Sequence, residues 1–257
     1  MKKSKLNIWF VVLAVCAFSL TNELLAQGPP INTDSPILLG LEGGGFRTFG
    51  KIVSTDLGET YIQPLAIPYN LTTNLQIGAI QPFVTRFPKN GENQSGFGNL
   101  SLFAKQMLLQ IDSKAKTFRS LLKFTQTFPT GASSVSADVY SSQFMLVTGF
   151  VTLDYSLNTS IGYSFVSENL PDNLVYNFAF GYPLLPQKYP PFQLNLYLEL
   201  NGQHTFDVNK SILFLSPGIQ LITSSIFLVE SSLQFPIVDD IGIMNFTYSL
   251  GIRYLIF

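Results

Sequence analysis

The strongest constraint on the fold of this chain is an alternation of apolar side chains with small or polar ones at every second position. It is clearest over residues 159–165, 192–201 and 244–254. Side chains of a β-strand point to opposite faces with a period of two, whereas a helix repeats every 3.6 residues. Each stretch therefore predicts a strand with one apolar and one polar face, and the sequence holds no sustained helical period.

The same pattern, broken by clusters of turn-forming residues, predicts twelve strands. A strand needs about 9–11 residues to cross a membrane, and the expected strands fit that length. Connections near 155–157 and 223–225 are short, whereas those at 88–97, 129–139 and 184–191 are longer, which is typical of a barrel with short turns at one rim. The expected strands are residues 41–50, 59–68, 74–87, 98–110, 116–128, 140–153, 158–167, 173–182, 192–203, 211–222, 226–236 and 242–256.

Composition separates a membrane barrel from a soluble β-sandwich. Charged residues make up only 12% of the chain and the mean hydropathy is +0.27, yet beyond the N-terminus no apolar run approaches the roughly 18 residues of a spanning helix. A sandwich turns charged side chains outward, whereas here the face opposite the apolar one carries Asn, Ser, Thr, Gly and Gln. We therefore expect an all-β fold, a transmembrane antiparallel up-and-down barrel over residues 37–257 with lipid on the apolar face.

Residues 1–26 are typical of a secretory signal peptide, with a basic start, an apolar run and a small residue, Ala26, at the cleavage point. Cleavage there leaves residues 27–36, which are polar and rich in proline, as an irregular N-terminal segment. Two alternatives stay open. One is a retained signal anchor, for which the apolar run is short. The other is a lipoprotein attached through Cys16, for which Val15 is a poor neighbour.

The sequence excludes several classes of site. It contains one cysteine, Cys16, and one histidine, His204, so disulfide frameworks and Cys/His metal clusters cannot form within one chain. No Gly-x-Ser-x-Gly motif surrounds a serine, and a net charge of −1 offers no basic patch for nucleic acid. Residues 43–45 are interpreted as a flexible strand segment, and Asp239 and Asp240 as a solvated turn. We therefore expect no enzyme activity, no bound metal and no cofactor.

Charged residues inside the expected strands are few, and by local parity six of them share the less apolar face. A central Lys or Arg on the lipid face costs about 2–4 kcal/mol, so these side chains are expected to point into the lumen. There they would either select solutes by charge or pair with one another and plug a narrow barrel. The six are Lys105, Arg119, Lys123, Glu199, Glu230 and Arg253.

Four short motifs are spread over most of the chain: GPPINTDSP at 28–36, GFGNLSLFAK at 96–105, FPTG at 128–131 and a closing hairpin over 229–236 and 251–254. Together they resemble the outer-membrane transporter family of the MetA pathway of phenol degradation. Asn99 stands where that family usually has Asp. The resemblance implies a barrel that passes small, often hydrophobic compounds.

The expected function is passive diffusion of small hydrophobic or aromatic compounds through a channel in the outer membrane of a Gram-negative bacterium. The N-terminal segment or the long loops would gate the lumen. The expected partners are outer-membrane lipid, these solutes, and the barrel-assembly machinery, which would recognise the last strand ending in Phe257. The alternatives are a structural or adhesive barrel with a closed lumen, and a lipid-modifying barrel enzyme that uses His204.

Overall fold

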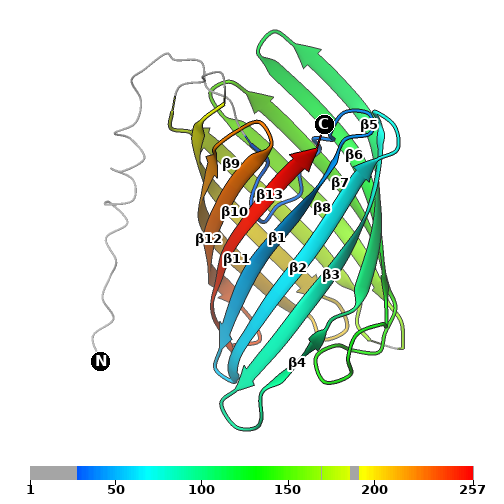
Figure 1. Ribbon diagram of the computed structural model, residues 1–257. Coiled ribbons are helices and arrows are strands. Elements are labelled where there is room, and N and C mark those ends of the chain that lie inside the picture. The colour runs from blue at the N-terminus through cyan, green and yellow to red at the C-terminus, as the bar shows by residue number, and fades with distance from the viewer. Residues whose placement is uncertain (1–27, 169, 186–190, 257) are drawn as a thin grey trace, which may run out of the picture.

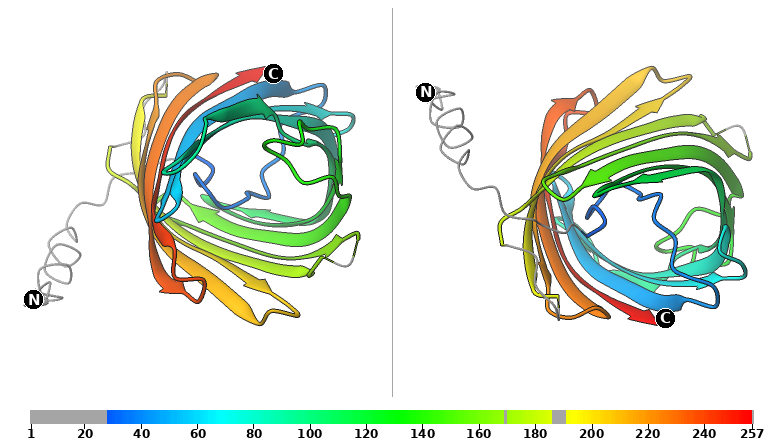
Figure 2. Two further views of the ribbon diagram at one scale, coloured as in Figure 1. Left: turned by 90° about the horizontal axis from the view of Figure 1, so that it is seen from below. Right: turned by 90° about the horizontal axis from the view of Figure 1, so that it is seen from above.

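The computed structural model of the protein describes residues 28–168, 170–185 and 191–256. These residues form a closed antiparallel barrel of twelve strands, as the alternation predicts (Figures 1 and 2). The first strand pairs with the last, which closes the barrel. The expected signal peptide and the end of the chain at Phe257 lie outside the described residues.

Thirteen β-segments build the twelve strands, because one strand is interrupted. The segments are β1 (Gly44–Thr55), β2 (Gly58–Asn70), β3 (Leu75–Pro88), β4 (Gln94–Phe97), β5 (Leu100–Ser113), β6 (Lys116–Phe128), β7 (Ser141–Thr152), β8 (Ser156–Val166), β9 (Asn173–Pro183), β10 (Gln193–Thr205), β11 (Lys210–Ile222), β12 (Phe227–Asp239) and β13 (Met244–Ile256). β3 pairs with β5 at one end and with β4 at the other, so β4 and β5 are one strand broken at Gly98 and Asn99.

Differences from the expected strands lie at their ends. β1 begins at Gly44 rather than at residue 41, because a turn in which the Gly43 N–H donates to the Gly40 carbonyl at 2.9 Å precedes it. It continues past residue 50 to Thr55, over polar residues that interrupt the apolar pattern. The connection from β9 to β10 shares a rim with the two-residue turn between β5 and β6. One rim therefore carries both short turns and a longer connection, unlike the predicted separation of the two kinds.

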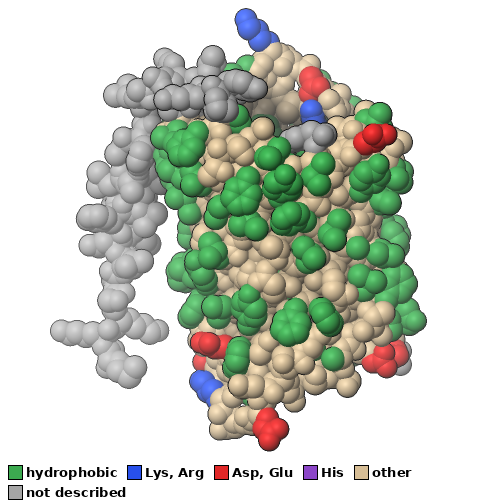
Figure 3. Space-filling view, in the orientation of Figure 1, with side chains coloured by type: hydrophobic (Ala, Val, Ile, Leu, Met, Phe, Trp, Pro, Cys, Tyr) green, Lys and Arg blue, Asp and Glu red, His purple; other side chains and the backbone are tan. Residues whose placement is uncertain are grey.

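The two faces of the barrel wall differ in polarity. Leu198 is 48% exposed on the outside, whereas its neighbour Glu199 is 0% exposed inside. Apolar side chains cover much of the outer wall, and acidic and basic ones lie near its two ends (Figure 3), as lipid-facing strands require. None of the described residues forms a helix long and apolar enough to cross a membrane. Exposed apolar side chains of this wall include Leu65, Phe83, Leu102, Leu146, Ile161, Phe178, Ile219 and Leu250.

Residues 28–43, which we call the plug, contain no strand; most of them lie inside the barrel, and residues 40–42 are exposed where the plug leads into β1 (Figure 2). The plug enters at the end where β1 begins and β13 ends (Figure 1). Its Leu38 is buried in a cluster with Leu121 and Val147 of the barrel wall. The irregular segment expected up to residue 36 therefore continues to the start of β1 and occupies the lumen.

The loop between β6 and β7, residues 129–140, reaches over the opposite opening (Figure 2). The Asn99 side chain anchors it: the Asn99 Oδ1 accepts the Gly131 N–H at 2.9 Å and its Nδ2 donates to the Ala137 carbonyl at 2.8 Å. Val135 at the loop tip is buried. An aspartate at position 99 could accept the first bond but could not donate the second, so the asparagine suits this loop.

Leu198→Arg should destabilise the barrel in lipid by about 2–4 kcal/mol, because it places a charge on the lipid-facing side of β10. Denaturant unfolding in liposomes measures the loss. Leu57→Arg is the matched control, since Leu57 is 68% exposed in the turn between β1 and β2 at the rim. Equal losses for the two variants would contradict the assignment of the outer face.

Candidate functional site: the lumen and its plug

The inner face of the barrel has a polar wall and an apolar wall. The polar wall follows β8 to β13 and carries amides, hydroxyls and two glutamates, most of them buried. The apolar wall follows β2 and β3, where alternate residues on the inner face are aliphatic or proline. The strand register places on that wall Ile62, Pro64, Ala66, Pro68, Ile80, Pro82 and Val84. A lumen of this kind can hold a polar peptide on one side and an apolar solute on the other.

Glu199 on β10 holds the backbone of the plug. Its fully buried carboxylate accepts the N–H groups of Ile31 at 2.8 Å, Asn32 at 3.0 Å and Thr33 at 2.7 Å, and also the Thr33 hydroxyl at 2.8 Å. Charge-assisted hydrogen bonds of this kind are stronger than neutral ones. They provide acceptors for three consecutive backbone N–H groups, which in a strand would bond to a neighbouring strand.

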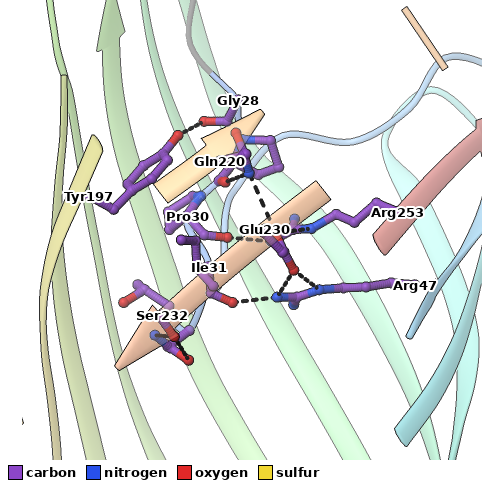
Figure 4. A network of polar contacts seen from close by, with 12 residues as sticks. Gly28, Pro30, Ile31, Arg47, Tyr197, Gln220, Glu230, Ser232 and Arg253 are labelled. Carbon is purple, nitrogen blue, oxygen red and sulfur yellow. Dashed lines mark hydrogen bonds and ion pairs between the residues drawn. The ribbon is translucent and has the colours of Figure 1, made fainter. Parts of the chain in front are cut away.

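Glu230 on β12 joins the plug to the seam where the barrel closes. Arg47 on β1 and Arg253 on β13 are direct cross-strand partners, and their guanidinium groups lie 2.6 and 2.8 Å from the two oxygens of Glu230. Each arginine also donates to a plug carbonyl, Arg47 to Ile31 and Arg253 to Pro30 (Figure 4). One carboxylate thus forms ion pairs with two guanidinium groups, and both of these groups also bind carbonyls of the plug.

Neutral side chains of the polar wall bind the rest of the plug backbone. Tyr197 donates its hydroxyl to the Gly28 carbonyl, and Gln220 donates to the Pro29 carbonyl at 2.9 Å (Figure 4). The Asn32 side chain donates to the Ser232 hydroxyl at 3.1 Å. Together with Glu199 and the two arginines, these groups give the plug hydrogen bonds of the kind that a buried irregular backbone needs.

The plug has two acidic residues, of which Glu42 is exposed at its end and Asp34 lies against the barrel wall. The two oxygens of Asp34 lie 3.0 Å from Lys105 Nζ on β5 and 2.8 Å from Lys123 Nζ on β6. Burial alone would raise the pKa of the Asp34 carboxyl, but the two ammonium charges hold this pKa well below its usual range. Asp34 is therefore ionised at neutral pH and forms an ion triplet with the two lysines.

Five of the six residues predicted from parity contact the plug directly or through a shared partner. Lys105, Lys123, Glu199 and Arg253 bond to it, and Glu230 binds the arginines that do. Arg119 lies apart, because it interacts with the exposed Asp112 at 3.8 Å near the rim.

Two charged residues of this network, Asp34 and Arg47, are absent from the predicted set. Asp34 lies in a segment without periodicity, and Arg47 is followed on the same inner face by the apolar Phe49, which obscures the parity of β1. The excess of cations over anions among the six predicted residues was a signal that a further anion had to lie nearby.

A cavity of about 320 Å³ separates the plug from the apolar wall. Its apolar lining includes Phe103, Ile80 and Pro64, and the Asp34–lysine triplet lies at its edge. A second cavity of about 360 Å³ is lined by Lys51 and by amides of the polar wall. Asp34 lines both cavities, so the plug lies between them.

Residues considered for catalysis or metal binding lie elsewhere. His204 has the parity of the outward leucines of β10, and its Nδ1 lies 2.9 Å from the Ser211 hydroxyl. The Asp239 carboxylate accepts backbone N–H groups of its own turn, including that of Gly242 at 2.9 Å. In the part of the chain that the structure describes, no group of three or more His, Cys, Asp or Glu side chains could hold a metal ion.

No protein-family model and no curated protein matches the chain, so the resemblance to the MetA-pathway family rests on its short motifs. Solved structures are similar in fold. An outer membrane channel from Pseudomonas putida F1 has a TM-score of 0.66 at 11% identity, over 88% of this chain and 100% of that chain. The KdgM porin in complex with disordered oligogalacturonate has a TM-score of 0.51 at 11% identity, over 81% and 98%.

The β domain of the Bordetella autotransporter BrkA has a TM-score of 0.50 at 12% identity, over 83% of this chain and 99% of that domain. At such identities the likeness shows the fold alone. That fold is the one of bacterial outer-membrane β-barrels.

Glu230→Ala should lower the free energy of unfolding by about 3–5 kcal/mol, because it leaves two buried guanidinium groups without a counter-charge. Glu92→Ala, in the exposed loop between β3 and β4, is the control and should change it little. Unfolding followed by the heat-dependent gel shift in detergent compares the two. If both variants unfold alike, the ion pairs at the seam do not support the barrel.

The plug should loosen in acid. Because the docked pKa of Asp34 is lowered, its ion pairs contribute fully above about pH 4, the ordinary carboxyl pKa, and the docking equilibrium weakens by up to about tenfold per pH unit below that. A spin label on Ile37→Cys should therefore gain mobility between pH 6 and pH 2. In an Asp34→Asn background the gain should be smaller. Identical profiles in the two backgrounds would show that Asp34 does not hold the plug.

Proposed function

We propose that the protein is an outer-membrane channel through which small hydrophobic or aromatic compounds diffuse passively, with the plug as its gate. The single observation that carries this proposal is the two-walled lumen: polar side chains hold the plug, and an apolar wall borders a cavity of about 320 Å³ beside it. A barrel whose lumen served only as a packed core would fill that space.

The route follows from the same arrangement. A solute that enters from the end covered by residues 129–140 meets the apolar wall of β2 and β3 and then the plug. The plug is held by hydrogen bonds and ion pairs rather than by strand pairing. Its movement therefore leaves the barrel wall intact. Diffusion down a gradient needs no cofactor and no energy coupling.

Export and location belong to the same proposal. The signal peptide over residues 1–26 would direct the chain across the inner membrane, and the apolar outer wall would hold it in outer-membrane lipid (Figure 3). The last strand, β13, and Phe257 would engage the barrel-assembly machinery. The chain would then belong to the MetA-pathway family, whose short motifs it resembles.

A closed structural or adhesive barrel is the second candidate, and the extent of the plug network favours it. Buried ion pairs to Glu230, Asp34 and the backbone bonds to Glu199 would suit a permanent filling. The lipid-modifying enzyme is less well supported. It would have to use His204 with Ser211, which lie on the outward-facing parity of β10 and β11, away from the lumen.

A disulfide between Asn32→Cys and Ser232→Cys tests whether the plug is the gate. These side chains touch in the native structure, and the chain beyond the predicted signal peptide contains no other cysteine. In liposomes, the oxidised variant should pass no small solute, and reduction should restore swelling and single-channel conductance. Asn32→Cys alone is the control, which should not respond to reduction.

Equal conductance of the oxidised and reduced forms would show that solutes do not need the plug to move. Absence of conductance in the reduced form, in the control and in the native protein would favour the closed barrel.

A further inference from the structure

Lys105 and Lys123 are placed so that they require an anion between them. They are direct partners in the register of β5 and β6, and their side chains are only 14% and 13% exposed. Like charges opposite one another destabilise a sheet, and a buried charge without a partner is costly. Departure of Asp34 leaves the lysine pair without a counter-charge unless another anion takes its place.

The space beside the lysine pair is apolar. The cavity of about 320 Å³ reaches it, and the Phe103 ring lies against it, with its centroid 5.9 Å from Lys105 Nζ and 5.8 Å from Lys123 Nζ. A cavity of about 150 Å³ is large enough for benzene. The site therefore has room for one substituted ring or a short aliphatic chain whose charged end meets the two ammonium groups.

The charge of the lumen favours an anion. Around the plug and its two cavities, the inner face of the described strands carries the cations Arg47, Lys51, Lys105, Lys123 and Arg253 and the buried anions Glu199 and Glu230. Asp34 is the further anion of the lumen, and it lies on the plug. When the plug moves, Asp34 leaves with it and the net positive charge of the lumen increases. A carboxylate solute restores the balance, whereas a neutral solute does not.

We infer that the Lys105–Lys123 pair is a carboxylate-exchange site for small aromatic or aliphatic monocarboxylates. The carboxylate of the solute replaces that of Asp34 on the two ammonium groups, and its apolar part enters the cavity against Phe103. No covalent bond changes and no proton moves. As a step in passage the inference rests on the proposed channel function, and as a binding site it can be tested without any passage.

The test is binding of 4-fluorobenzoate to the purified protein in detergent, followed by fluorine NMR line broadening. We expect saturable binding to the native protein and about tenfold tighter binding to Asp34→Asn, in which the competing carboxylate is gone. Lys105→Met with Lys123→Met should abolish it. Lys51→Met, which removes one positive charge from the lumen outside the lysine pair, is the control and should bind within about twofold of the native protein.

A neutral analogue and a competing inorganic anion show which part of 4-fluorobenzoate the site recognises. Neutral 4-fluorobenzyl alcohol should show no saturable binding, and inorganic phosphate should not displace 4-fluorobenzoate at concentrations where benzoate does. Native-like binding by the double Lys variant, equal binding of the alcohol, or equal displacement by phosphate would overturn it. If the double variant does not fold, Lys123→Gln alone should bind at least about fivefold more weakly.

The two proposals fail separately. A protein that binds 4-fluorobenzoate through the lysine pair but conducts no solute after reduction of the plug disulfide refutes the channel and retains the site. A protein that conducts but binds 4-fluorobenzoate no better than its double Lys variant refutes the site alone.

Discussion

The need to pair every backbone polar group without the help of water is the constraint on which this structure depends. In hydrocarbon the chain can meet it only by closing its sheet, and β1 pairs with β13 for that reason. Closure creates an inner face with as many positions as the outer one. The plug is irregular backbone brought into that interior, so the constraint applies again. There, side chains such as Glu199 and Gln220 supply the hydrogen bonds that neighbouring strands supply within the barrel wall.

The two walls of the lumen differ in chemistry: one can hydrogen-bond a peptide and the other offers an apolar surface. The polar wall binds peptide through charge-assisted hydrogen bonds, which are directional and depend on particular partners. The apolar wall of β2 and β3 offers a surface without donors or acceptors, against which a solute is held only by exclusion from water. A plug anchored to one wall leaves the other accessible. Binding of the plug and, in the proposed channel, passage of a solute therefore depend on different side chains for most of the lumen.

The strands could be predicted from the sequence because a strand between lipid and a polar lumen alternates apolar and polar residues. On strands such as β10 and β12 the apolar residues lie outside and their neighbours face the lumen, so the faces of Glu199 and Glu230 could be predicted without knowing their partners. The apolar inner wall of β2 and β3 lacks this contrast. The predicted strand ends failed where that signal fades, as at the polar end of β1 around Thr55.

The plug could not be predicted in the same way. Its position is set by contacts between residues far apart in the chain, such as Thr33 with Glu199, which are 166 positions apart. No local periodicity carries such information. Arg119 shows a further limit of parity: it shares the face of Lys123 on β6, but near the rim it pairs with Asp112 rather than with the plug. Parity gives the face of a residue and leaves its depth along the barrel undetermined.

The register that places Arg47 opposite Arg253 has a consequence for how the protein assembles. These residues belong to the first and the last strands, so they meet only when the barrel closes. Their repulsion opposes that final pairing, and Glu230 together with the carbonyls of Pro30 and Ile31 relieves it. Closure of the barrel and docking of the plug are therefore coupled, because the same two arginines take part in both.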